Sequence, residues 1–171
     1  MGPSLRFCMV TTFYPPYSFG GDGMFVYRFS NLLAERGHSV DVIHCRDAYY
    51  AQHATEPVGE WPNHPRITLH SLKSKAGILS PLLTQQLGIP GLKAGKIKRI
   101  LTEGRFDVIH YHNVSLVGGP KVLEYGCAIK LYTTHEYWLL CPTHVLFKFN
   151  QEACTKPSCL MCQLSCRKPP Q

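Results

Sequence analysis

The strongest constraint on the fold is a repeated order of short apolar segments and helical segments along the first 140 residues. Residues 5–10 form a short apolar run that ends in two threonines, as expected for a strand buried on both faces of a parallel sheet. A loop rich in proline, glycine and aromatic residues follows, and apolar residues from 25 to 33 then recur at helical spacing. Residues 39–44 have the pattern of a second strand, which completes a βαβ unit.

The same alternation continues further along the chain. It predicts strands at 66–72, 106–111 and 128–133, a helix at 92–103 and a short helix at 120–125. Residues 46–65 are expected to form a loop, and residues 77–91, with their prolines and glycines, an irregular or broken helix. This order is typical of an α/β fold with a Rossmann-like, doubly wound parallel sheet. We expect this domain over residues 1–140 and a cysteine-rich, irregular segment over 141–171.

Composition restricts the class of protein. The chain has 171 residues, 44% of them hydrophobic and 17% charged, which indicates one globular domain with a tail rather than a disordered protein. No apolar run reaches the roughly 18 residues that span a bilayer, and no cleavage site follows the first apolar run, so we expect a cytoplasmic protein.

The formal net charge of +7 has two explanations. It suits anionic surroundings, such as a diphosphate ligand or peripheral contact with an anionic membrane at its inner face, and it equally suits a solvated basic surface. The sequence contains no nucleic-acid-binding motif, so no nucleic-acid partner is expected.

The run Gly20, Gly21, Asp22, Gly23 lies between the first strand and the first helix. Backbone N–H groups at such a position can approach a phosphate, with the positive end of the helix behind them. Asp22 is expected to cap the helix. The alternative is a tight turn that needs positive φ angles. Nine residues separate Val10 from Gly20, which disfavours a dinucleotide fingerprint and favours a loop that closes over a ligand.

Three histidines follow strand ends. His110 and His112 are expected on one face near the carboxyl end of a strand, and His135 follows the next strand at the same edge of the sheet. Ligands of open α/β sheets bind at this edge. The three side chains are therefore candidates for contacts with sugar hydroxyls or for zinc ligation, with ordinary structural histidines as the alternative.

Five of the eight cysteines lie between Cys141 and Cys166. We expect Cys141, Cys154, Cys159 and Cys162 to be metal ligands and leave Cys166 spare. Four thiolates suit a structural zinc ion or an iron–sulfur cluster. Free or incidentally paired thiols are the alternative.

Several motifs, taken in order, resemble the N-terminal domain of family 4 glycosyltransferases of the GT-B fold. They are the run from Phe13 to Gly21, the helix end and turn at 32–40, the strand at 107–112, and Thr134 with His135. The resemblance covers residues 5–140 and does not extend to the cysteine-rich segment.

The resemblance implies a retaining transfer of a sugar from a nucleotide diphosphate sugar donor to a carbohydrate or lipid-linked acceptor, without a catalytic metal. Gly20, Gly21 and Asp22 would then be donor-binding residues, with Gly20 and Gly21 beside the diphosphate and the reacting sugar. His135 would contact the sugar near the anomeric centre, and His112 would line the acceptor side. A site of this kind lies between two Rossmann-like domains.

The resemblance covers only the N-terminal half of the family's architecture. The C-terminal domain, with its basic pair for the diphosphate, has no counterpart in these residues, so we expect a fragment, truncated product or split subunit that is inactive alone. The competing hypothesis is a metal-bearing binding or regulatory module that uses the cysteine cluster and performs no catalysis.

Overall fold

The computed structural model describes residues 3–141, 143–149 and 151–165. The contacts between residues divide the chain into two compact units, Met1–Thr133 and Thr134–Gln171. His135 therefore groups with the cysteine-rich residues. The expected division into domains at 1–140 and 141–171 stays a prediction.

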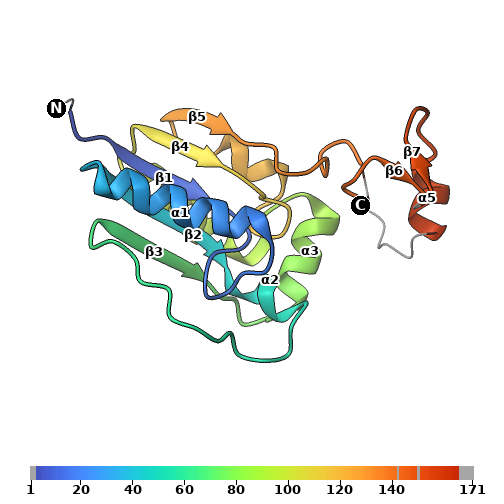
Figure 1. The fold of residues 1–171 in the computed structure, drawn as a ribbon, viewed down its shortest axis with the longest axis horizontal. Coiled ribbons are helices and arrows are strands. Elements are labelled where there is room, and N and C mark those ends of the chain that lie inside the picture. Colours follow the sequence, from blue (N-terminus) through green and yellow to red (C-terminus); the bar gives the residue numbers. More distant parts are fainter. Residues whose placement is uncertain (1–2, 142, 150, 166–171) are drawn as a thin grey trace. The chain divides into compact units, whose positions relative to one another are not determined.

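The first unit contains a five-stranded parallel sheet in the order β3-β2-β1-β4-β5 (Figure 1). Its strands are β1 (Arg6–Val10), β2 (Ser39–Cys45), β3 (Ile67–Leu72), β4 (Val108–Tyr111) and β5 (Ile129–Tyr132). Strands β2 and β3 follow β1 on one side of the sheet, and strands β4 and β5 are then added on the other side of β1. The predicted doubly wound α/β sheet is thus confirmed, and its switch point lies between β1 and β4.

The central strand explains the apolar run with which the sequence begins. Cys8, Met9 and Val10 are completely buried because β1 has a neighbour on each side and is covered on both faces. Val10 is in register with Ile43 of β2 and Tyr111 of β4. Strands β1 and β4 therefore end level, and β2 continues two residues further, so the segments that follow them start at one edge of the sheet.

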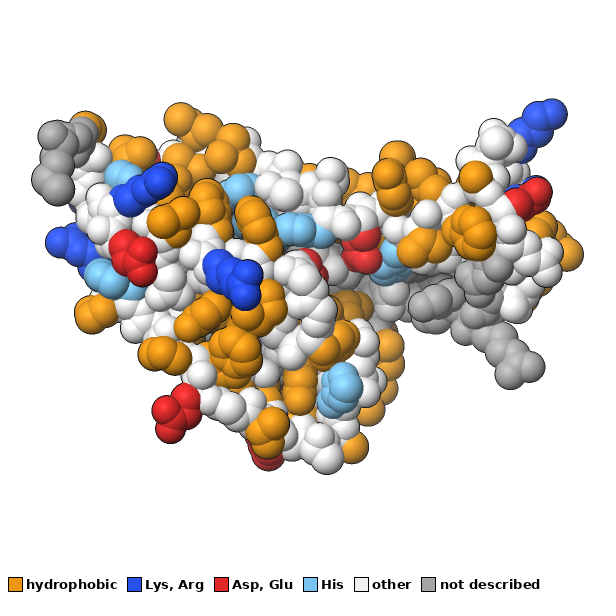
Figure 2. All heavy atoms as spheres, viewed as in Figure 1, with side chains coloured by type: hydrophobic (Ala, Val, Ile, Leu, Met, Phe, Trp, Pro, Cys, Tyr) orange, Lys and Arg blue, Asp and Glu red, His pale blue; other side chains and the backbone are white. Residues whose placement is uncertain are grey.

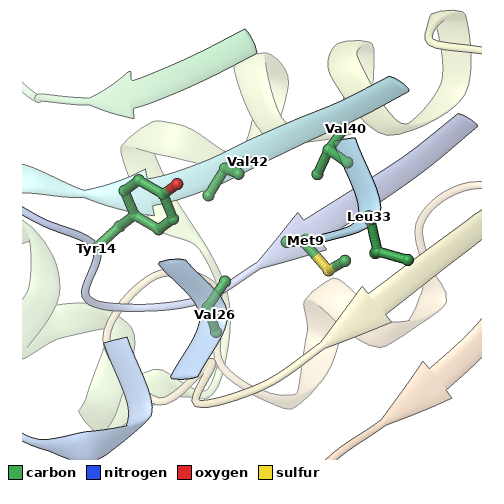
Figure 3. Packing of buried hydrophobic residues seen from close by; sticks show 6 residues of the cluster. All are labelled: Met9, Tyr14, Val26, Leu33, Val40 and Val42. Carbon is green, nitrogen blue, oxygen red and sulfur yellow. The ribbon is translucent and has the colours of Figure 1, made fainter. Parts of the chain in front are cut away.

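Helix α1 (Gly21–Glu35) covers one face of the sheet. Its residues Val26 and Leu33 pack against side chains of β1, β2 and the loop after β1 (Figure 3). The buried cluster consists of Met9, Tyr14, Val26, Leu33, Val40 and Val42. Apolar burial of this kind contributes about 1.5 to 3 kcal/mol for each large side chain.

The opposite face is covered by α4 (Ala94–Glu103) and the 3-10 helix η2 (Pro120–Glu124). The Tyr111 hydroxyl donates to the carbonyl oxygens of Val122 and Tyr125 at 3.2 and 3.1 Å. Ile97 and Leu101 are the buried residues of α4. Helical segments on both faces complete the layered architecture that the sequence predicted.

Two helices lie where the sequence predicted loop or irregular structure. Helix α2 (Arg46–Tyr50) occupies the start of the expected loop, because its Asp47 and Tyr49 are buried by tertiary contacts that propensity does not report. Helix α3 (Leu79–Leu87) tolerates Pro81 because a proline in the first turn removes no helical hydrogen bond. It ends at Gly88, which has a left-handed φ of 67°.

The second unit is more ordered than the irregular segment we expected. Strands β6 (Phe147–Lys148) and β7 (Glu152–Ala153) form a short antiparallel hairpin, and α5 (Cys159–Ser165) follows.

A short 3-10 helix, η1 (Gly91–Lys93), precedes α4 in the first unit. Among the described residues, no helix combines the length and the apolar character needed to cross a bilayer.

Candidate functional site at the carboxyl edge of the sheet

The loop after β1 starts between the ends of β2 and β4. The Thr11 N–H donates to the carbonyl oxygen of Ile43 at 3.0 Å, and the Thr12 N–H donates to that of Asn113 at 2.6 Å. The Thr12 carbonyl oxygen accepts from the Cys45 N–H at 3.1 Å. These bonds extend the sheet by two residues and fix the direction in which the glycine run leaves it.

The glycine run forms the start of α1. Gly20 is the residue before the helix and has a φ of 99°, a conformation that favours glycine. Asp22 lies inside the first turn, so the expectation that it caps the helix was wrong. The chain enters the helix earlier than expected, because the positive φ of Gly20 provides the sharp turn. Asp22 accepts from a first-turn N–H, that of Gly23, from a position inside the helix.

The glycines of this run differ in what holds them. A Cβ atom on Gly23 would lie 2.1 Å from the Ser18 Oγ and 3.1 Å from the Phe13 carbonyl oxygen, so close packing of the loop against α1 requires glycine there. A Cβ atom on Gly21 would meet no atom within 4 Å, and Gly21 does not need a positive φ. Gly20 and Gly21 are both exposed. Gly21 is thus the glycine of this run for which the fold gives no reason.

Asn113 connects the end of β4 to the glycine run. Its side-chain amide donates to the Asp22 Oδ2 at 3.3 Å, and its Oδ1 accepts from both the N–H and the hydroxyl of Ser115 at 3.2 and 2.7 Å. The Asp22 Oδ1 accepts from the Gly23 N–H at 2.7 Å. Sequence reasoning missed this role for Asn113, although its position directly after His112 at the strand end was a usable signal.

His110 and His112 lie on one face of β4 and its extension, as predicted. Their ring centroids are 4.1 Å apart, and the His110 Nε2 and the Thr133 hydroxyl form a hydrogen bond of 2.7 Å. The rings of Phe25 and Phe29 on α1 pack against His112 and His110 at 5.8 and 6.0 Å. His112 is completely buried beneath α1. Its contact with an acceptor stays a prediction.

His135 is exposed and belongs to the second unit. Its contact with a donor sugar stays a prediction, as does a joint site that includes Gly20, His112 and His135.

An aromatic cluster packs against the loop after β1. Tyr17 stacks on His44 at 6.1 Å and meets the Tyr49 ring edge-on at 5.8 Å, and the Arg46 guanidinium lies 4.3 Å from the centre of the Tyr17 ring. Burial lowers the pKa of His44 to about 4, and the neighbouring positive charge of Arg46 adds to the effect. His44 is therefore neutral near pH 7 and serves as a packing residue.

Two hollows adjoin the glycine run in the first unit. One has a volume of about 200 Å³ and is lined by residues that include Gly20, Pro16, Tyr49 and Trp61. The other has a volume of about 450 Å³ and lies along α1. Its lining residues are Gly21, Met24, Phe25, Arg28, Phe29 and Leu32. Figure 2 shows hydrophobic side chains exposed on the face of the first unit that α1 covers.

In the second unit, Cys141, Cys154, Cys159 and Cys162 all line one small cavity. Burial alone would raise the pKa of the Cys141 thiol, but hydrogen bonds from Thr143 and from the backbone N–H groups of neighbouring residues lower it below its usual value. Within the described ranges, no group of three or more His, Cys, Asp or Glu residues is arranged to hold a metal ion. Cys166 lies outside the described residues.

Comparison with known proteins gives two findings. A family model described as Glycosyltransferase Family 4 matches residues 19–153. The chain is also 26% identical over 159 residues to an uncharacterized 42.6 kDa protein of the cps region in Klebsiella pneumoniae. That match covers 89% of this chain and 42% of the relative, so the chain spans less than half of the relative's length.

Proposed function

This chain belongs to glycosyltransferase family 4, and we propose that it provides one part of a site where a sugar passes from a nucleotide diphosphate sugar to an acceptor. The transfer retains the configuration at the anomeric carbon and uses no catalytic metal. Gly20 and Gly21 approach the donor diphosphate, and His135 contacts the donor sugar near the anomeric centre.

The observation that carries this proposal is the environment of Gly21. Its neighbours Gly20 and Gly23 are explained by a positive φ and by close packing, whereas a Cβ atom on Gly21 would point into open space. A glycine without a structural reason at the first turn of a helix suits the close approach of a phosphate to the backbone. The first N–H groups of a helix lack a carbonyl partner four residues earlier and can make this contact. In α1 the Gly23 N–H already donates to the Asp22 Oδ1, so the proposed contact uses the N–H groups before it.

The chemistry of the reaction needs such donors. The leaving diphosphate gains negative charge in the transition state, and fixed N–H groups stabilise that charge without reorganisation. The Asp22 carboxylate cannot donate to a diphosphate, and it accepts from the Gly23 N–H and from the Asn113 amide. We assign Asp22 to positioning the loop through these two hydrogen bonds.

The acceptor site fits the larger of the two hollows, which is lined by residues of α1. Its volume of about 450 Å³ lies in the range of small-ligand sites, and it begins at Gly21. Phe25 and Phe29 provide apolar ring surface, and Arg28 provides a cation within the same lining. This combination suits a carbohydrate or lipid-linked acceptor. His112 supports this wall from beneath Phe25.

We further propose that a second domain of the family's kind completes the donor site. Family 4 membership and the greater length of the Klebsiella relative support this view. Each missing donor to the leaving diphosphate would cost about 3 to 4 kcal/mol of transition-state stabilisation, or a hundredfold or more in rate. Residues 1–171 alone are therefore expected to transfer sugar slowly.

The test compares residues 1–171 with a protein extended through a second domain, on a panel of UDP- and GDP-sugars, by measuring the release of nucleotide diphosphate. We expect release by the extended protein, a large loss in its His135→Ala variant, and little release by residues 1–171. Robust transfer by residues 1–171 would contradict the need for a second domain. Inactivity of both forms with every donor would favour a binding or regulatory module instead.

A surface feature supports peripheral contact with an anionic membrane at its inner face. Leu79, Leu83 and Leu87 of α3 are more than half exposed and recur every four residues, so they form an apolar stripe on one side of the helix. Exposed basic residues flank α3 in the sequence, namely Lys73 and Lys75 before it and Lys96, Lys98 and Arg99 after it. An apolar stripe with basic neighbours suits an anionic lipid surface.

Vesicle co-sedimentation tests this contact. Binding to phosphatidylglycerol vesicles should exceed binding to phosphatidylcholine vesicles and should weaken as salt rises. Leu83→Glu should reduce binding, whereas Val58→Glu, a change at an exposed apolar residue in a loop, should not. Equal binding to both vesicle types, or equal loss in both variants, would contradict a specific role for α3.

A further inference from the structure

The four cysteines of the second unit come together from three segments of the chain. Cys141 precedes the hairpin, Cys154 follows β7 directly, and Cys159 and Cys162 lie three residues apart on α5. Residues three apart in a helix lie on the same side. All four line one cavity, together with Thr143, Phe147, Lys148 and Ser158.

Hydrogen bonds reach two of the sulfur atoms. The Phe149 N–H donates to the Cys162 Sγ at 3.5 Å, and the Cys141 Sγ and the Thr143 hydroxyl form a hydrogen bond of 3.3 Å. Leu146 and Phe149 have positive φ values of 50° and 55°, which non-glycine residues adopt rarely. N–H donors to thiolate sulfur are typical of the outer shell of a metal site.

Apolar burial does not account for the order of this unit. Among its described residues, the buried side chains are Cys141, Thr143 and Cys162. The large apolar side chains of the unit are mostly exposed, including Leu140, Val145, Leu160, Met161 and Leu164. A hairpin with two-residue strands and a seven-residue helix needs another source of stability, and small units commonly obtain it from a metal or from disulfides.

The small size of the cavity suits a single ion. Its volume of about 20 Å³ accommodates one body the size of a water molecule. An organic ligand or a multinuclear iron–sulfur cluster would need more room. Lys148 also lines the cavity and would offset part of the negative charge of four thiolates around a divalent ion.

We propose that Cys141, Cys154, Cys159 and Cys162 bind one zinc ion that holds the hairpin and α5 together. Four thiolates in tetrahedral geometry are one of the usual ligand sets of structural zinc. The present side-chain positions do not enclose an ion, so binding requires rotation of thiols about their Cα–Cβ bonds. Cys154 is half-buried and Cys159 is exposed, so both have room for this rotation.

The experiment uses the 171-residue chain purified without chelator. Elemental analysis should give about one zinc per chain, and cobalt added after zinc removal should give the visible spectrum of a tetrahedral thiolate complex. Each Cys→Ser change at the four positions should weaken zinc binding by about tenfold or more, since even outer-shell changes cost this much. Cys127→Ser is the matched control, because Cys127 is an exposed thiol of the first unit.

A readout on wild-type protein avoids the problem of variants that fail to fold. Chelation should expose the second unit to protease while the first unit resists, and added zinc should restore protection. Four thiols that titrate freely in native protein purified without chelator, disulfides among the four cysteines, or stoichiometric iron with acid-labile sulfide would each overturn the proposal.

Discussion

The Asn113 side-chain amide donates a hydrogen bond to the Asp22 carboxylate across 3.3 Å. The two residues are far apart in the sequence, and the bond joins the segment after β4 to the first turn of α1. It spans the point at which the strand order of the sheet reverses, between β1 and β4. The glycine run is therefore held at the place where ligands of such sheets bind.

Reversing the polarity of this pair tests its role. Asn113→Asp keeps an acceptor for Ser115 but sets a second carboxylate against Asp22, so the free energy of unfolding should fall by about 2 kcal/mol or more. Adding Asp22→Asn restores a donor and an acceptor and should recover at least half of the loss. Urea unfolding of the two single variants and the double variant measures the coupling. Strictly additive effects would show that the bond contributes nothing.

Gly23→Ala tests the packing of the loop on α1. The new Cβ atom would clash with the Ser18 Oγ and press on the Phe13 carbonyl oxygen, so we expect a loss of about 1 to 3 kcal/mol in unfolding free energy. Combining it with Ser18→Gly removes the nearest obstacle and should recover part of that loss. Thermal unfolding unchanged in Gly23→Ala would show that the loop has room that the structure does not indicate.

His44 should make the first unit sensitive to acid. Its pKa is about 4 in the folded protein, because of burial and Arg46, and about 6.5 when unfolded. The unfolded state thus binds more protons between these values, and stability decreases as the pH falls from 6.5 towards 4, by about 3 kcal/mol from this group. Urea unfolding across this range should show the loss of stability in wild type and a smaller loss in His44→Gln. The exposed control His53→Gln should lose as much stability as wild type. An equal pH dependence in all three proteins would contradict this assignment.

The features that sequence predicted best have a local cause. The buried run at β1 and the helical spacing in α1 report periodicity directly, and alternation along β4 places His110 and His112 on one face. These patterns were sufficient for the parallel sheet and for the edge at which the candidate site lies.

The features that sequence missed depend on contacts between distant segments. Helix α2 is buried against Tyr17 and Phe19 of the loop after β1, and a five-residue helix has no periodicity of its own. Asp22 is a residue type that often caps helices. The turn at Gly20 places the helix start before Asp22, however, and the Asp22 side chain accepts a hydrogen bond from Asn113 instead. Such pairings cannot be read from residues that are adjacent in the sequence.

Comparing Gly21→Ala with Gly95→Ala in the protein extended through a second domain tests the proposed donor site most directly. Both glycines are exposed, both lie in the first turn of a helix, and a Cβ atom on either would meet no atom within 4 Å. Neither change should destabilise the fold, and each can add up to about 1 kcal/mol of stability. We predict that only Gly21→Ala lowers kcat/KM for the sugar nucleotide, by about tenfold to a hundredfold, because its methyl group displaces the diphosphate from the backbone N–H groups. Equal kcat/KM values for both variants and the parent protein would contradict the donor site proposed at the glycine run.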